Sequence, residues 1–338
     1  MLHTRLCDLL GIEHPIISAP MAGSAAADLA AAVSAAGGFG LIGGTTSGGA
    51  DWLRAQIRAV RERTDRPFGV GFITSFPGVD DLVRVALEER VAAISHSFAD
   101  PTPYVAAAHA AGVKVLNQVQ TVAQARTAVR AGVDAIAAQG TEAGGHTGYS
   151  GTLPLVPAVV DVAGAIPVVA AGGIADGRGL AAVLMLGAEG AWLGTRFVAS
   201  REWAGGEWAK ERVVAATADD TVLTHAYDLA TAAPFPAGIG DRVLRNDYTA
   251  TWHERDGEVV AHREELVTQL RAAQQAGDAR VAAVRAGNAA SLIDAVEPAG
   301  EIVRRIVAEA ERVLRERLGR VVRAWEGGSV GVRENPGG

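Results

Sequence analysis

The residues best suited to take part in chemistry lie in the stretch QGTEAGGHTG, residues 139–148, where Glu142 and His146 stand among four glycines. Glycine leaves the backbone free to adopt conformations closed to other residues and to approach a ligand closely. A histidine in such a loop can act as a general base or, when protonated, can bind an anion. Glu142 could orient His146, but we favour a role in accepting hydrogen bonds from backbone amides of the turns. The competing interpretation of His146 is a surface histidine in a flexible loop.

The elements around this stretch have to position it. Short apolar runs alternate with alanine-rich segments, a pattern typical of successive βα units around a parallel sheet. Eight such units close a TIM (β/α)8 barrel, which is the α/β fold that we predict. An open doubly wound sheet is the alternative, but the first turn, SAPMAG, lacks the glycine fingerprint of that fold. The expected strands are residues 15–19, 39–42, 68–74, 92–97, 114–119, 135–139, 167–171 and 190–193.

The chain divides into three predicted parts. Residues 1–205 form the barrel, residues 206–290 form a lid or small appended subdomain of helical and irregular structure, and residues 291–338 form a closing helix that packs back on the barrel. Regular alternation stops near residue 200. The aromatic residues that follow either line a lid over the barrel mouth or form the core of the appendage. They are Trp203, Trp208, Tyr227, Phe235, Tyr248 and Trp252.

Glycines follow the last two predicted strands. In a closed barrel these loops and a nearby helix start often bind phosphate, because free backbone N–H groups converge there. Gly172 and Gly173 can bring their amides against phosphate oxygens, and Gly194 and Thr195 can add an amide and a hydroxyl. The remaining strand ends carry carboxamides, Gln118 and Gln139 among them, but no cluster of lysines. This lining suits a neutral planar heterocycle better than a second polyanion.

Composition excludes several classes of partner. The 338-residue chain has a net charge of -7, with 49% hydrophobic and 20% charged residues, as expected of a globular protein. An acidic chain offers no basic field for nucleic acid or for an anionic membrane surface, and we expect neither as a partner. The longest nearly uncharged run, residues 153–175, is broken by prolines, glycines and the charge of Asp161, which argues against a membrane span. The single cysteine, Cys7, and the absence of a signal-like N-terminus favour a cytoplasmic location.

Two other readings of the site remain open at this point. Glu142, His146 and His96 could be ligands of a hydrolytic metal, although no H-E-x-x-H or H-x-H spacing supports this and we expect no metal. His96, at the end of the fourth predicted strand, is equally well a structural histidine. A barrel that only binds a phosphorylated ligand is also possible, because fold does not fix function.

Three stretches together resemble the FMN-dependent nitronate monooxygenases, formerly called 2-nitropropane dioxygenases, which are barrel flavoproteins. They are PIISAPMAG, AQGTEAGGHTG and AAGGIADGRGLAAVLMLGAEGAWLGTRF. The resemblance covers most of residues 1–200 and, more weakly, the stretch AGNAASLIDAVEPAGEIV. It extends to the bacterial flavin-dependent enoyl-ACP reductases, which share the barrel and these motifs.

The resemblance implies a role for each matching residue. Ala19, Pro20 and Met21 would lie against the flavin ring, and Gln118 and Gln139 would contact its polar edge. Gly172, Gly173, Gly194 and Thr195 would bind the FMN phosphate. Gly144 and Gly145 would let the loop bring His146, the catalytic histidine, over the flavin. Many family members have asparagine at the flavin-contacting position that corresponds to Gly71, and Asn288 and Ala289 depart from the closing motif.

The implied activity is an oxidoreductase reaction, in which an alkyl nitronate is oxidised with O2 as co-substrate. The alternative is an NAD(P)H-dependent flavin reductase of an enoyl thioester or a quinone, for which no separate nicotinamide fingerprint is needed. In either case the substrate is a small molecule. A homodimer is compatible with a barrel that carries such an appendage.

Overall fold

The computed structural model describes residues 2–46 and 48–321. Eight parallel strands form one sheet in the order β1-β9-β8-β6-β5-β4-β3-β2. A parallel bridge between Ile17 and Phe39 connects the two ends of this order, so that the sheet closes into a barrel. The predicted TIM barrel is therefore confirmed. The strands are β1 Ile16–Ser18, β2 Gly40–Gly43, β3 Phe68–Ile73, β4 Ala93–Ser97, β5 Lys114–Val119, β6 Ala135–Gln139, β8 Val168–Ala171 and β9 Gly190–Leu193.

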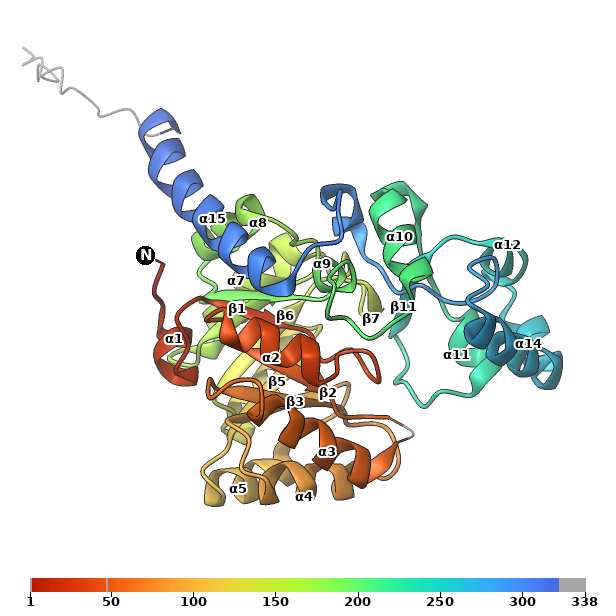
Figure 1. The fold of residues 1–338 in the computed structure, drawn as a ribbon, viewed down its shortest axis with the longest axis horizontal. Helices are drawn as coiled ribbons and strands as arrows, with labels where there is room; N and C mark the ends of the chain where they lie inside the picture. Colours follow the sequence, from red (N-terminus) through yellow and green to blue (C-terminus); the bar gives the residue numbers. More distant parts are fainter. Residues whose placement is uncertain (1, 47, 322–338) are drawn as a thin grey trace, which may run out of the picture.

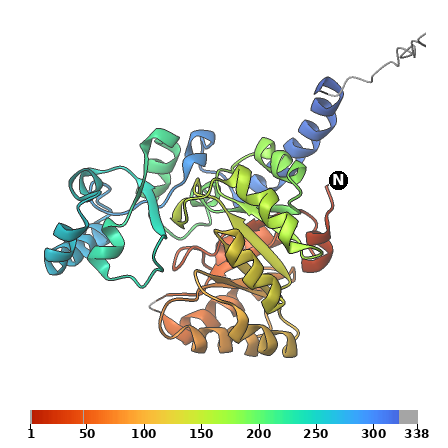
Figure 2. The ribbon, with the colours of Figure 1, turned by 180° about the vertical axis from the view of Figure 1, so that it is seen from behind.

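Helices surround the barrel on the outside (Figures 1 and 2). Each strand is buried on both faces, which explains why the strands read as apolar runs rather than as alternating patterns. Ile16 and Ile42 pack against the outer helices, whereas their neighbours Ile17 and Leu41 fill the barrel interior. The helices of the barrel are α2 Ala27–Ala35, α3 Gly49–Arg61, α4 Val79–Glu88, α5 Thr102–Ala110, α6 Val122–Ala131, α7 Thr152–Ala163, α8 Gly177–Met185 and α9 Thr195–Val198.

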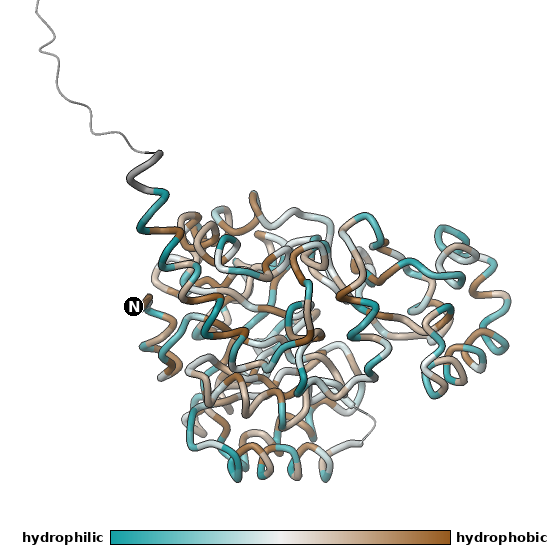
Figure 3. The backbone as a smooth tube through the Cα atoms, turned by 45° about the horizontal axis from the view of Figure 1, so that its top comes forward, coloured by the Kyte–Doolittle hydropathy of each residue, from teal (hydrophilic) through white to brown (hydrophobic). Residues whose placement is uncertain are grey.

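Two helices close the barrel from outside the repeat. In α1, Arg5–Leu10, the side chains of Leu6, Cys7 and Leu10 join the interior cluster, away from the appendage (Figure 1). In α15, Ala299–Val321, Ile302 and Ile306 are buried, and the helix packs on α8 and α2. Hydrophilic and hydrophobic residues alternate along α15, as expected of an amphipathic helix (Figure 3). Residues 322–338 of the predicted closing segment lie outside the described residues.

The appendage contains a small sheet that the sequence analysis did not predict. Strand β11, Gly240–Leu244, pairs with β10, Thr221–Thr224, on one side and with β7, Gly145–Thr147, on the other, in an antiparallel sheet. Residues 145–147 of the stretch that we expected to be a loop are thus tied to the appendage, with Asp241 opposite His146. The helices of the appendage are α10 Glu207–Ala215, α11 Ala226–Thr231, α12 Asp247–Trp252, α13 Asp256–Ala261 and α14 Arg263–Ala276.

The two interpretations of the appendage aromatics each apply to some of them. Tyr227 and Tyr248 stack on each other inside the appendage core, with ring centroids 4.6 Å apart. Trp203, Trp208 and Phe235 instead line a cavity that faces the barrel. Among the described helices, none combines the length and the apolar character that crossing a lipid bilayer requires.

Candidate active site

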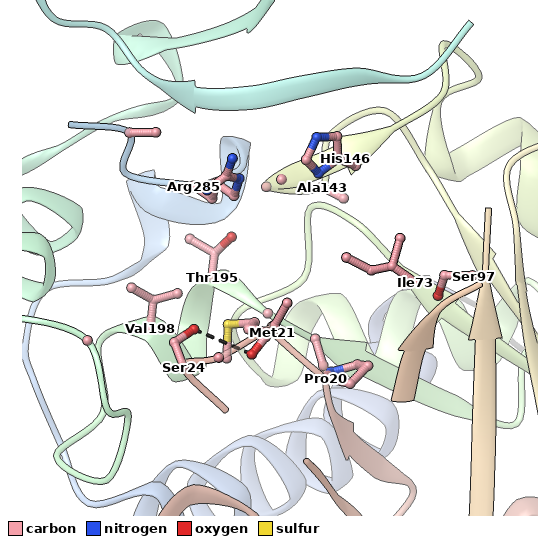
Figure 4. A pocket seen from close by; sticks show the side chains of 18 of the residues that line it. Pro20, Met21, Ser24, Ile73, Ser97, Ala143, His146, Thr195, Val198 and Arg285 are labelled. Carbon is pink, nitrogen blue, oxygen red and sulfur yellow. Dashed lines mark hydrogen bonds between the residues drawn. The ribbon is translucent and has the colours of Figure 1, made fainter. Parts of the chain in front are cut away.

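A cavity of about 720 Å³ lies at the carboxyl ends of the barrel strands, where it is bordered on the other side by the appendage. Figure 4 shows His146 and Arg285 on one side of it and Pro20 and Met21 on the opposite side. The cavity is at the end of the barrel where the loops of TIM-barrel enzymes carry the active site. Most residues predicted from the sequence line it, namely Ala19, Pro20, Met21, Gln118, Gln139, Gly144, Gly145, His146, Gly172, Gly173, Gly194 and Thr195.

One end of the cavity has the features of a phosphate site. Gly172 and Gly173 adopt φ angles of 100° and 74°, which favour glycine, and a Cβ atom on Gly172 would come within 2.8 Å of the Gly140 carbonyl oxygen. The Thr195 side chain is buried, and its Oγ1 accepts a hydrogen bond of 3.0 Å from the Gly287 amide. A hydroxyl that accepts one bond still has a hydrogen to donate. Thr195 can therefore donate to an anionic oxygen beside the two glycines.

Two carboxamides, those of Gln118 and Gln139, also line the cavity. Gln139 Oε1 accepts a hydrogen bond of 3.0 Å from Nε2 of Gln120, a buried residue that the sequence analysis did not single out. This bond fixes the Gln139 amide, so that its NH2 group remains for a ligand. Among the described residues the Gln118 side chain makes no hydrogen bond, and it faces the cavity. Both carboxamides can form hydrogen bonds with the polar edge of a planar ring.

Gly71 is placed differently from the other predicted residues. It does not line the cavity. A Cβ atom on Gly71 would lie 2.2 Å from Pro20 Cγ and 2.6 Å from Ser95 Oγ, so this position packs behind Pro20. Its influence on a ligand would therefore pass through Pro20, and its predicted contact with a cofactor stays a prediction.

His146 lies where β7 meets the cavity, and its partner comes from the appendage. Its Nε2 is 2.9 Å from Oδ1 and 3.1 Å from Oδ2 of Asp228 on α11. The side chains are only 10% and 12% exposed, so water competes little for this contact. The imidazole stacks on Phe235, with ring centroids 3.4 Å apart, and Phe98 meets it edge on at 6.2 Å. The histidine is held in place and is not a surface group of a flexible loop.

Glu142 does not contact His146. Both of its carboxylate oxygens accept hydrogen bonds from the Thr152 amide, at 3.0 and 2.9 Å, and Oε2 accepts a third from the Thr152 hydroxyl. Thr152 is the first residue of α7, so Glu142 satisfies a free amide at the start of this helix. This is the backbone-bonding role that the sequence analysis favoured.

His96 is a structural residue outside the cavity. It is fully buried, its Nδ1 lies 2.9 Å from Thr74 Oγ1, and its ring stacks on Tyr104. Burial lowers its pKa to about 4, because desolvation disfavours the charged imidazole. The interpretation of Glu142, His146 and His96 as a metal site is wrong, since the three side chains have separate partners.

A different group of potential ligand atoms occurs in the described part of the chain. One atom each of His146, Asp228 and Asp241 lies within 4.8 Å of the others. The buried Asp241 is, however, paired with Arg285, whose Nη2 is 2.8 Å from Oδ2. Asp241 in turn raises the pKa of Arg285, which keeps the guanidinium charged. Because protein groups already compensate these charges, we read the group as a hydrogen-bonding network rather than as a cation site.

Two residues of the site, Asp228 and Arg285, were not found by sequence reasoning, and Phe235 was named only as one of the aromatics that line a lid or form the appendage core. All belong to the segment after residue 205, where no motif or regular period marks them. Only their proximity to His146 in the folded chain identifies them.

Comparisons with known proteins agree with this architecture. The model of the nitronate monooxygenase family matches residues 3–82 and 73–309. The chain is 39% identical to a nitronate monooxygenase of Pseudomonas aeruginosa, over 65% of this chain and 76% of that protein. It is 32% identical to a (3aS,4S,5R,7aS)-5-hydroxy-7a-methyl-1-oxo-octahydro-1H-indene-4-carboxyl-CoA dehydrogenase of Mycobacterium tuberculosis, over 91% of this chain and 96% of that one.

Among solved structures, FabK from Thermotoga maritima superposes with a TM-score of 0.87 and 41% identity, covering 95% of this chain and 100% of the other. The family match spans the barrel, the predicted phosphate loops and the appendage strands that hold His146. The chain belongs to the nitronate monooxygenase family and is an oxidoreductase.

Proposed function

We propose that this protein is an FMN-dependent nitronate monooxygenase, which oxidises alkyl nitronates with O2. The observation that carries the proposal is that one cavity joins the glycine and threonine cradle at the ends of β8 and β9 to the imidazole of His146. A ligand with a phosphate at one end and a planar redox ring at the other would span these two groups.

The residues present suit FMN. The cradle of Gly172, Gly173 and Thr195 offers room for phosphate oxygens where a side chain would block them, and a hydroxyl that can donate. The available NH2 of Gln139 and the Gln118 carboxamide match the donors and acceptors of a flavin ring edge. When bound, FMN would supply the redox chemistry, because it can accept electrons from a nitronate and pass them to O2.

The contribution of the chain is to position the substrate. His146 would remove the α proton of a neutral nitroalkane or, when protonated, would donate a hydrogen bond to the anionic nitronate. Phe98 and Phe235 border the imidazole, whose side chain is largely shielded from water. A drier site strengthens the interaction between an imidazole and an anion.

The competing function is reduction of an enoyl thioester or a quinone with NADH or NADPH at the same site. It is favoured by the full-length similarity to FabK and by that to a dehydrogenase of a CoA-linked substrate. The two functions differ in the electron donor, since one uses the nitronate and the other uses a nicotinamide.

The deciding experiment mixes the purified holoenzyme anaerobically with ethyl nitronate, NADH or NADPH, and follows the flavin absorbance in a stopped-flow spectrometer. We expect fast bleaching by the nitronate. Fast bleaching by a nicotinamide alone would establish the reductase instead. A colourless protein that does not bind added FMN would contradict both functions.

The role of His146 is tested by His146→Ala, with the exposed His262→Ala as the matched control. Loss of a positioned acid or base lowers turnover by about 10²- to 10⁴-fold. We expect this loss with FMN still bound in His146→Ala, and normal turnover in the control. Unchanged turnover in His146→Ala would remove the histidine from the mechanism.

A further inference from the structure

The hydrogen bond between His146 and Asp228 connects two parts of the chain that are 82 residues apart. An ionised carboxylate only accepts hydrogen bonds, so the imidazole atom that faces it, Nε2, has to be the donor. A neutral imidazole with its hydrogen on Nε2 has its lone pair on Nδ1. The contact therefore selects one of the two neutral tautomers of His146.

The other ring nitrogen is left for a ligand. Nδ1 of His146 makes no hydrogen bond to any described residue, and it is not sealed from solvent. The ring itself lines the cavity and stacks on Phe235, which fixes the plane of the imidazole. A fixed plane together with a fixed tautomer leaves the Nδ1 lone pair as the acceptor that this ring can offer to a ligand.

The carboxylate that makes this contact is itself supported by the appendage. Asp228 belongs to α11. Asp241, which lies opposite His146 in the register of β7 and β11, forms an ion pair with Arg285. Since Arg285 neutralises Asp241, Asp228 is the carboxylate left to bind the imidazole. Glu142 cannot replace it, because both of its oxygens are used by Thr152.

We propose that Asp228 is the positioning residue of the active site: it holds His146 as the Nε2–H tautomer, so that Nδ1 is the atom that acts on the substrate. This inference rests on the proposed function of His146. In the nitroalkane reaction, Nδ1 accepts the proton of the α carbon, and the electron pair of the broken C–H bond moves into the nitro group to give the nitronate. The imidazolium that results has both ring hydrogens, and Asp228 stabilises it through Nε2–H.

A second cavity makes this proposal testable by chemical rescue. It has a volume of about 390 Å³ and is lined by Asp228, Asp256 and Arg263 among others. Asp228 therefore borders both cavities, and we expect its truncation to let a small anion reach His146 from the outer side. Formate in the space left by Asp228→Ala can accept the Nε2 hydrogen in place of the lost carboxylate.

The kinetic experiment compares Asp228→Ala, Asp228→Asn and Asp228→Glu with the control Asp256→Ala, which removes an exposed carboxylate from the same outer cavity. For Asp228→Ala and Asp228→Asn we expect kcat for a nitroalkane to fall on the order of 10²-fold with KM nearly unchanged. Formate should restore part of kcat in Asp228→Ala but none in His146→Ala. Asp228→Glu should retain more activity than Asp228→Asn. Normal kcat in Asp228→Ala, or no rescue by formate, would overturn the proposal.

A second measurement needs neither flavin turnover nor substrate. Long-range ¹H–¹⁵N spectra of the full chain, with the His146 ring assigned by its loss in His146→Gln, report which nitrogen carries the hydrogen in the neutral ring. We expect hydrogen on Nε2 in the parent protein and a mixture of tautomers in Asp228→Ala. Hydrogen on Nδ1 in the parent would refute the role of Asp228. The same spectra remain informative if nitronate oxidation is not the activity, so the two failures are distinguishable.

Discussion

Gly71 packs directly against Pro20, and a Cβ atom on Gly71 would come 2.2 Å from Pro20 Cγ. Pro20 lines the cavity and Gly71 lies behind it. An asparagine at position 71, as the resemblance describes for many family members, cannot be added here while Pro20 stays in place. The absence of a side chain at position 71 thus allows Pro20 to keep its place in the wall of the cavity.

For Gly71→Asn we expect a loss of stability and weaker FMN binding together. Overpacking of a dense interior typically costs about 1–3 kcal/mol, and relief requires Pro20 to move into the cavity. The free energy of unfolding in urea and the FMN dissociation constant measure the two effects. Gly257→Ala, at a position in α13 where a Cβ atom meets nothing within 4 Å, is the control: it should not lower the free energy of unfolding and should leave FMN binding unchanged.

Replacing Thr195 with valine should weaken the binding of FMN through loss of the hydroxyl that donates to its phosphate. A hydrogen bond to a charged group is worth about 1.5–3 kcal/mol, which corresponds to roughly a 10- to 100-fold rise in the dissociation constant. Flavin fluorescence quenching measures it, with Thr195→Ser as the variant that keeps the hydroxyl. Riboflavin, which lacks the phosphate, should bind to parent and Thr195→Val alike. An equal loss for riboflavin would place Thr195 away from the phosphate.

Gln120 should act on a flavin through Gln139. In Gln120→Leu the Gln139 amide loses the donor that fixes it at 3.0 Å, and one ordinary hydrogen bond is worth about 0.5–1.5 kcal/mol. We expect FMN to bind roughly 2- to 10-fold more weakly and its visible absorption bands to shift. Gln124→Ala, which leaves the Gln120 side chain in place, is the comparison. Unaltered bands in Gln120→Leu would show that Gln139 does not depend on this bond.

His96 should make the protein less stable in mild acid. Its folded-state pKa of about 4 is below the unfolded value of about 6.5, so between these two values the unfolded chain binds the additional proton. The contribution of His96 to the free energy of unfolding is therefore fully present above pH 6.5. It is lost as the pH drops toward 4, by about 3 kcal/mol in total. Urea unfolding at pH 7 and pH 5 measures this slope. His96→Asn should flatten the slope, whereas His262→Asn, an exposed histidine, should leave it as it is.

The sequence was informative wherever a local pattern determines structure. Alternating apolar runs and alanine-rich segments predicted eight strands, and the closed barrel confirmed them. Because the carboxyl ends of parallel strands meet at one face, residues that follow those strands were correctly placed around a common cavity. His146, Gln139 and Thr195 were found in this way, Gln139 as the last residue of a strand and the other two from their positions after one.

Local patterns do not reach across the chain, and the remaining features depend on such long-range contacts. Pairing of β7 with β11, the hydrogen bond from His146 to Asp228 and the stacking of Phe235 on the imidazole all join segments that are distant in sequence. No periodicity in residues 206–290 indicates which side chains turn toward the barrel. Packing likewise decides that a side chain at position 71 would point at Pro20 rather than into the cavity.

The sequence by itself therefore determined the barrel, the glycine and threonine cradle and the histidine at its mouth, since strand periodicity and turn glycines act over a few residues. Only the tertiary structure decided which carboxylate holds that histidine, because Glu142 is four residues away and is used by Thr152, while Asp228 is 82 residues away and is brought into contact by the docking of the appendage.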